Sequence, residues 1–177
     1  MKAIMVDIET LGTSPDAAII SLGMAAFNDS ELIATAGLAI RPADWHGDID
    51  PSTVHWWMQQ SAEARMFSFN GTGTAADAAL QLHHFIQQYG GEETWANDPS
   101  FDIVKLRQWW GRQNLAAPFP IHYRTERSLR TIIALAKELH IVLPGSAGTA
   151  HNPIDDAANQ ARTVLAARTG LRAGRIY

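Results

Sequence analysis

Two acidic residues near the N-terminus are the first side chains whose type and spacing suggest chemistry. Asp7 and Glu9 follow residues 3–6, an uninterrupted apolar run typical of a buried strand. Side chains alternate along a strand, so both carboxylates lie on one face, about 6.6 Å apart at their backbones. Two such carboxylates repel each other, and a hard cation such as Mg²⁺ would relieve the repulsion. From these two residues alone, a metal site and a pair of solvated acids are equally good interpretations.

Two later stretches, residues 95–102 and 150–157, have the same pattern: each leads into a predicted helix and has a proline near the first helical position. Each places acidic side chains in the first helical turn, where they favour the helix dipole. Asp98 and Asn152 are good N-cap residues, and capping is the favoured role for Asp98. These two stretches are therefore expected to be helix starts, whatever else they do.

Capping does not account equally well for Asp102, His151 and Asp156. An imidazole with an unperturbed pKa near 6.5 suits a general base at neutral pH, although a lone loop histidine is more often structural. Helical periodicity does not choose between Asp155 and Asp156, because both lie more than a quarter-turn from the apolar face at about 100° per residue. These side chains remain candidates for a site rather than assigned ligands.

The elements that must position these side chains begin with strands. An antiparallel meander is expected from strands that end near Asp7 and that cover residues 18–27 and 32–40, with short turns between them. The later pattern alternates helices with short strands. Helices are expected at residues 51–65, 75–89, 129–139 and 153–169, and a further helix is expected from residue 98 onward. Short strands are expected at residues 94–96 and 121–123. Loops or irregular chain are expected at residues 41–50, 66–73 and 144–148. This order predicts an α/β mixed sheet with helices packed on it.

Composition sets broad limits on the class of protein. The 177 residues suit a single domain spanning 1–177, in which residues 170–177 are expected to be a mobile tail. Cysteine is absent, which excludes disulfides and thiolate sites and fits a cytoplasmic protein. No apolar run is long enough to predict a membrane span. The net charge of −4 argues against nucleic-acid binding, but only weakly, because two bound divalent ions would bring the total charge to zero.

Taken together, the motifs resemble the DEDD superfamily of 3′→5′ exonucleases in its histidine-bearing DEDDh branch. The matching residues are Asp7-Ile8-Glu9-Thr10, then Asn97 followed by Phe101-Asp102, then His151 with four residues before Asp156. Their order and spacing match over about residues 1–170. Two positions differ from the family pattern: Asp98 stands where a small residue is usual, and Pro153 stands where alanine is frequent. Neither is a proposed ligand, so these differences affect the expected shape of the loops rather than the chemistry. The Trp56-Trp57 pair and residues 124–131 look like small exoribonuclease-type members found in bacteria and prophages.

The resemblance implies an RNase H-like fold, with three antiparallel strands followed by shorter parallel ones, and a site for two Mg²⁺ or Mn²⁺ ions. Asp7 would bridge the ions, Glu9 and Asp156 would complete the first, and Asp102 would support the second. His151 would act as the general base. Two ions about 3.5–4 Å apart can clamp the attacking and leaving oxygens of a phosphoryl displacement. The resemblance also suggests a homodimer.

Substrate contacts are expected on several elements. By resemblance, Thr10 and Leu11 contact the terminal base and sugar, and Asn97 and Phe101 of the second motif also bind substrate. Trp56 and Phe69 are candidates for base stacking, whereas Trp57 and Phe67 are expected in the core. The three arginines at spacing i, i+3, i+6 would lie on one side of a helix and could meet phosphates or face solvent; they are Arg124, Arg127 and Arg130.

The sequence therefore predicts a metal-dependent 3′→5′ exonuclease that releases nucleoside 5′-monophosphates from RNA or single-stranded nucleic acid. A prophage-type DNA exonuclease is the nearest alternative, because no residue pattern reveals contacts to a 2′-hydroxyl. A small-molecule phosphodiesterase on the same fold is a second alternative. A nucleic-acid-binding module with a degenerate site is disfavoured, because all four acids are present.

Overall fold

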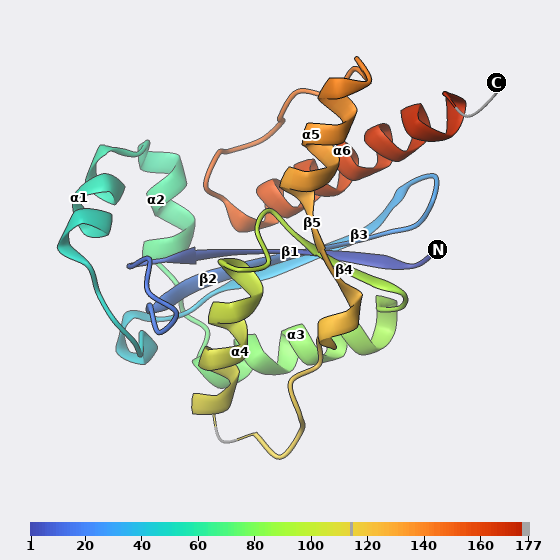
Figure 1. Ribbon diagram of the computed structural model, residues 1–177. Helices are drawn as coiled ribbons and strands as arrows, with labels where there is room; N and C mark the ends of the chain where they lie inside the picture. The colour runs from blue at the N-terminus through green and yellow to red at the C-terminus, as the bar shows by residue number, and fades with distance from the viewer. Residues whose placement is uncertain (114, 175–177) are drawn as a thin grey trace.

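The computed structural model describes residues 1–113 and 115–174 (Figure 1). The strands of this part of the chain are β1 (Ala3–Thr10), β2 (Ile19–Phe27), β3 (Leu32–Ala39), β4 (Glu93–Ala96) and β5 (Glu126–Ser128). The helices are α1 (Pro51–Gln59), α2 (Ala62–Phe69), α3 (Ala75–Tyr89), α4 (Asp102–Arg112), α5 (Leu129–Glu138) and α6 (Pro153–Ala173). Two 3₁₀ turns, η1 (Pro42–Asp44) and η2 (Tyr123–Thr125), lie in the connections.

The strands form one mixed sheet in the order β3-β2-β1-β4-β5. β1 pairs antiparallel with β2, and β2 pairs antiparallel with β3, so the predicted meander is confirmed. β4 lies parallel to β1, and β5 lies parallel to β4. The predicted α/β fold of RNase H-like type is confirmed, and its central strand is the one that bears Asp7 and Glu9.

Helices cover both faces of the sheet (Figure 1). α3 and α4 pack on one face, and α5 and α6 pack on the other. α1 and α2 lie beyond the end of β1, where a smaller cluster contains Leu11, Ile20 and Trp57. α3 covers residues 75–89 as predicted, and a capping box formed by Thr74 and Asp77 fixes its start.

Alternation along β1 decides where its acids point. Ile4, Val6 and Ile8 contribute to the core beneath α3 and α4, whereas Ala3 and Met5 contribute to the core beneath α5 and α6. Odd-numbered side chains of this strand therefore face α6. Because Asp7 and Glu9 continue the odd series, both acids point toward that helix.

Two glycines let α6 approach the sheet closely. A Cβ atom on Gly23 would lie 2.0 Å from the carbonyl oxygen of Pro153, and one on Gly37 would lie 2.4 Å from Cγ1 of Ile154. Gly23 is also the antiparallel partner of Asp7. The missing side chains bring the first turn of α6 directly over the strands next to Asp7.

The structure corrects the predicted helix at residues 51–65 and the predicted irregular segment at 66–73. α1 ends at Gln59, and a second helix, α2, continues through Phe69. Ser61 causes the break, because its hydroxyl accepts a hydrogen bond from the backbone N–H of Ala64 and caps α2. The chain therefore bends between the two helices rather than forming one.

Two further elements differ from the predictions. α4 begins at Asp102 rather than near Asp98. The short strand lies at Glu126–Ser128 instead of 121–123, where Ile121 is buried without joining the sheet. Consequently, the three arginines do not share a helix face: Arg124 lies in η2, Arg127 in β5 and Arg130 in α5.

The C-terminal helix is longer than expected. α6 continues to Ala173, so residues 170–173 are helical rather than part of a tail. The remaining part of the predicted tail, residues 175–177, lies outside the described residues. Among the residues that the structure describes, no helix has the length and apolar character needed to cross a membrane.

Candidate active site

The first acids of the site lie at the end of the central strand. Asp7 is 8% exposed, and Glu9 is partly buried two residues later. The side-chain amide of Gln160, on α6, donates a 2.7 Å hydrogen bond to Oδ1 of Asp7. The approach of α6 permitted by Gly23 thus places a donor against a carboxylate from the first strand.

The second acidic stretch turns from β4 into α4. Asp98 accepts hydrogen bonds from the backbone N–H and the hydroxyl of Ser100, at 3.0 and 2.7 Å. Its predicted role as the N-cap of the helix is wrong, because α4 begins at Asp102 and its N-cap is Phe101. The backbone N–H of Asp98 donates to Oδ2 of Asp102 at 3.2 Å. Arg130 forms an ion pair with Asp98 at 3.2 Å. This turn therefore leaves Asp102 buried and facing the end of β1.

The third stretch separates the two adjacent acids of α6. Asn152 caps the helix through its side-chain oxygen, as predicted. Oδ2 of Asp156 accepts the backbone N–H of His151 at 2.9 Å, whereas Oδ2 of Asp155 accepts that of Thr149 at the same distance. Asp155 therefore braces the preceding loop, and Asp156 turns toward the acids of β1.

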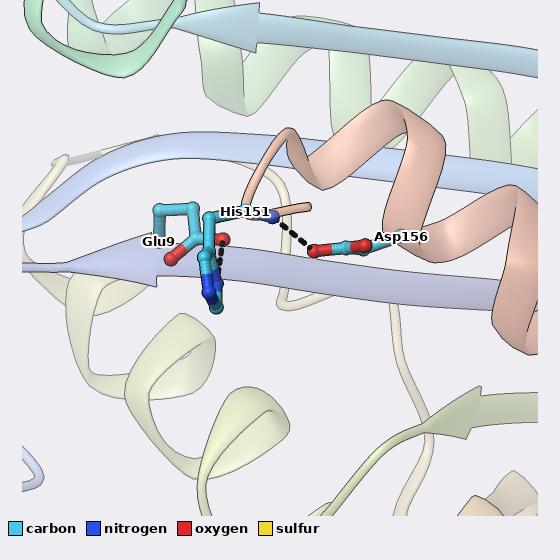
Figure 2. Close-up of side chains that lie close together, drawn as sticks. All are labelled: Glu9, His151 and Asp156. Atoms are coloured by element: carbon cyan, nitrogen blue, oxygen red, sulfur yellow. Dashed lines mark hydrogen bonds and ion pairs between the residues drawn. The ribbon is translucent and has the colours of Figure 1, made fainter. Parts of the chain in front are cut away.

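One pocket of about 270 Å³ brings the candidate residues together. It is lined by Asp7, Ile8, Glu9, Asn97, Asp98, Phe101, Asp102, Arg130, His151, Asp156 and Gln160. Ligand atoms of Glu9, His151 and Asp156 lie within 4.8 Å of one another. Figure 2 shows the imidazole of His151 beside Glu9, with 3.9 Å from Nδ1 to Oε1, and its backbone N–H directed at Asp156.

The four buried carboxylates of the pocket have raised pKa values, so they favour the binding of protons or cations. Burial, reinforced by the charge of Asp102, raises the pKa of Asp7 well above its ordinary value, although the Gln160 hydrogen bond opposes the rise. Burial and the charge of Asp7 raise the pKa of Glu9 to about 10. Burial raises the pKa of Asp102 to about 6 and also raises that of Asp156, which the hydrogen bond from His151 partly offsets.

The donor set fits the divalent ions that the DEDDh resemblance implies. Asp7, Glu9, Asp102 and Asp156 present carboxylate oxygens to one pocket, and Mg²⁺ and Mn²⁺ prefer such hard ligands. Their raised pKa values show that the folded chain disfavours four bare negative charges there. Positive ions among these oxygens would remove that electrostatic cost.

A second pocket of about 470 Å³ adjoins the first and shares Ile8, Glu9 and Phe101 with it. Thr10 and Trp56, both expected to contact substrate, line this pocket together with Gly12, Thr13, Ser52 and Thr53. Leu11 is instead buried in the cluster around Trp57 and lines neither pocket. Trp57 is 1% exposed, which agrees with its predicted core position, and Phe67 is half-buried.

Two residues of the site escaped the sequence analysis. Gln160 lies one helical turn after Asp156, and this spacing alone could have placed it on the same face. Lys105, only 2% exposed, places Nζ 3.3 Å from the ring centroid of Phe101, four residues earlier. Burial lowers the pKa of Lys105, against the opposing charges of Asp102 and Asp98. A buried cation thus lies beneath an aromatic ring shared by both pockets.

The fold and the acid–imidazole pocket are consistent with a DEDDh-type 3′-5′ exonuclease domain of the RNase H-like class. The chain belongs to the 3′-5′ exoribonuclease Rv2179c-like domain family, whose model matches residues 2–167. The family resemblance predicted from the sequence is therefore confirmed. No curated protein matches the chain.

Solved structures share the fold at low sequence identity. The metal-free complex of E. coli exonuclease I with single-stranded DNA has a TM-score of 0.63 and 14% identity over 99% of this chain and 40% of that chain. Exonuclease X with 5′-overhanging duplex DNA has a TM-score of 0.56 and 14% identity, covering 94% of this chain and 91% of that one. The nuclease domain of 3′hExo bound to rAMP has a TM-score of 0.63 and 13% identity, covering 98% of this chain and 92% of that one. This chain thus spans less than half of the exonuclease I chain.

Proposed function

We propose that this protein hydrolyses RNA or single-stranded nucleic acid from the 3′ end and releases nucleoside 5′-monophosphates. The observation that carries the proposal is the convergence of Asp7, Glu9, Asp102, Asp156 and His151 on one pocket from β1, α4, α6 and the loop before α6. Membership in an exoribonuclease family supports the reaction class. The rAMP held by 3′hExo and the single-stranded DNA held by exonuclease I support the substrate class.

The four acids, Asp7, Glu9, Asp102 and Asp156, would hold two divalent ions, Mg²⁺ or Mn²⁺. When bound, such ions lower the pKa of water and stabilise charge on the leaving oxygen. Asp102 is held by the backbone N–H of Asp98, so its carboxylate keeps one orientation toward the pocket. Gln160 holds Asp7 in the same way from α6.

His151 would accept the proton of the attacking water at a ring nitrogen. The water oxygen forms the new bond to phosphorus, the bond between phosphorus and the 3′-oxygen breaks, and solvent protonates that 3′-oxygen. The pocket that adjoins Glu9 would hold the terminal nucleoside against Thr10 and Phe101. Asn97 and Arg130, which line the acidic pocket, would contact the phosphate backbone.

The test uses matched RNA and DNA strands labelled at the 5′ end. A ladder that shortens from the 3′ end with Mg²⁺ or Mn²⁺, and that EDTA abolishes, is expected. A 3′-phosphate should block the reaction, whereas a blocked 5′ end should have little effect. Full activity in metal-free buffer, or shortening from the 5′ end, would refute the proposal. Cleavage of small phosphodiesters without any ladder would support the small-molecule alternative instead.

Location and assembly are further parts of the proposal. The cysteine-free composition supports a cytoplasmic protein. The resemblance to dimeric exonucleases supports a homodimer, and light scattering at several protein concentrations would test it. A monomer at every concentration would contradict that part alone.

A further inference from the structure

The imidazole of His151 packs against two tryptophans of α1. Its ring centroid lies 4.8 Å from that of Trp56, with the ring planes 80° apart. Trp57 lies 6.1 Å away at 76°, and the two indoles pack against each other at 5.1 Å. Edge-to-face contacts of this kind have a defined geometry and stabilise one relative orientation of the rings. The histidine ring therefore contacts an element far away in the sequence.

The loop that bears His151 supplies less restraint on that ring. Residues 139–152 join α5 to α6 without a strand or helix, and His151 has a φ of +63°, a left-handed conformation that is uncommon for residues other than glycine. The hydrogen bond to Asp156 holds its backbone N–H rather than its imidazole. The approach of Nδ1 to Glu9, at 3.9 Å, exceeds hydrogen-bond distance.

The tryptophan pair is fixed to the strand that bears the acids. The indole N–H of Trp57 donates a 2.9 Å hydrogen bond to the backbone oxygen of Thr10, the last residue of β1. Trp57 also packs against Phe69 of α2 at 5.3 Å. Trp56 is the outer member of the pair and is 39% exposed. A continuous chain of contacts thus runs from the end of β1 through Trp57 and Trp56 to His151.

We propose that Trp56 is a positioning residue that sets the orientation of the His151 imidazole relative to the acids of β1. The proposal rests on the proposed function, in which His151 is the general base. A misplaced base slows the chemical step, whereas a lost stacking surface weakens substrate binding. Positioning and base stacking by Trp56 therefore have different kinetic signatures, a fall in kcat and a rise in KM.

The kinetic test compares Trp56→Ala, Trp56→Phe and the wild type on a 5′-labelled oligonucleotide. Trp56→Ala should lower kcat by about 10- to 100-fold and leave KM within about threefold, because small displacements of a base cost rates of this order. Trp56→Phe keeps an aromatic edge and should recover most of kcat. Met58→Ala is the matched control, because Met58 lies on the same helix, is 68% exposed and lines neither site pocket. A rise in KM with unchanged kcat would overturn the proposal in favour of stacking.

A measurement without substrate separates this proposal from the proposed function. The ring-proton NMR signals of His151 can be identified by their absence from His151→Ala. They should move in Trp56→Ala and stay in place in Met58→Ala. Unchanged signals in Trp56→Ala would overturn the positioning contact, even in a fully active enzyme. A wild-type protein without exonuclease activity would instead refute the proposed function.

Discussion

Gln160 and Asp7 are joined by a 2.7 Å hydrogen bond across 153 positions of the chain. Asp7 lies on the central strand, and Gln160 lies one turn beyond Asp156 on the helix that crosses above it. The bond lowers the pKa of a carboxylate that burial and neighbouring acids otherwise raise. Gln160 therefore favours the charged form of Asp7.

Replacing Gln160 by methionine should weaken divalent-ion binding. The side chain keeps its approximate volume but loses the donor, and hydrogen bonds to charged groups contribute about 1.5–3 kcal/mol, so at least about tenfold more Mg²⁺ should be needed for half-maximal stabilisation. Thermal unfolding over a Mg²⁺ titration measures this. Gln88→Met, at an exposed position of α3, is the control. Equal Mg²⁺ requirements in both variants would contradict the assigned role.

The adjacent acids of α6 should behave differently. Asp156→Asn should lose metal affinity and nearly all turnover, because Asp156 lines the acidic pocket. Asp155→Asn should retain most activity and cost about 1 kcal/mol or less of stability, since Asp155 braces Thr149 and favours the helix dipole. Activity assays and denaturant unfolding provide both quantities. The opposite pattern would place the metal ligand one residue earlier.

Removing the imidazole should separate chemistry from binding. His151→Ala should lower turnover by about 10²–10⁴-fold, the usual range for a lost general base, while Mg²⁺ still stabilises the protein. Single-turnover assays and calorimetric Mg²⁺ titration check the two parts. A variant that loses Mg²⁺ binding along with activity would identify His151 as a metal ligand, in line with its closeness to Glu9 and Asp156.

The metal-free protein should lose stability as pH rises above about 5. The pKa of Asp102 is raised to about 6 and that of Glu9 to about 10, so the folded chain retains protons that the unfolded chain releases. Stability is then greatest below the ordinary pKa of these acids, about 4, and it falls as pH rises from there toward their folded-state pKa values. Melting temperatures between about pH 5 and 9 should show a decline that Mg²⁺ reduces. Glu9→Gln should reduce this decline of melting temperature with pH. An equally steep decline in that variant would show that the raised pKa of Glu9 is not its cause.

The sequence predicted the acids of the site better than their support. Three motifs can be recognised from their order and spacing in the sequence alone, and they contain Asp7, Glu9, Asp102 and Asp156. The spacing of Gln160 from Asp156 places the two on one helix face, but only the fold brings Gln160 against Asp7. The contact of Trp56 with His151 is likewise created by tertiary packing rather than by spacing.

The same limit explains the errors in the fold. β2 and α3 have clear apolar patterns and were predicted almost residue for residue. β5 consists of Glu126–Ser128, which has no apolar member; its pairing with β4 and its ion pair between Arg107 and Glu126 arise only in the folded chain. The break between α1 and α2 depends on one capping hydroxyl, that of Ser61.

The position of α6 over β1 also governs when the protein can act. β1 is synthesised before α6, yet the pocket needs side chains from both. A nascent chain on the ribosome therefore carries Asp7 and Glu9 well before it acquires His151 and Asp156. The site of the proposed nuclease is completed only after α6 has been synthesised.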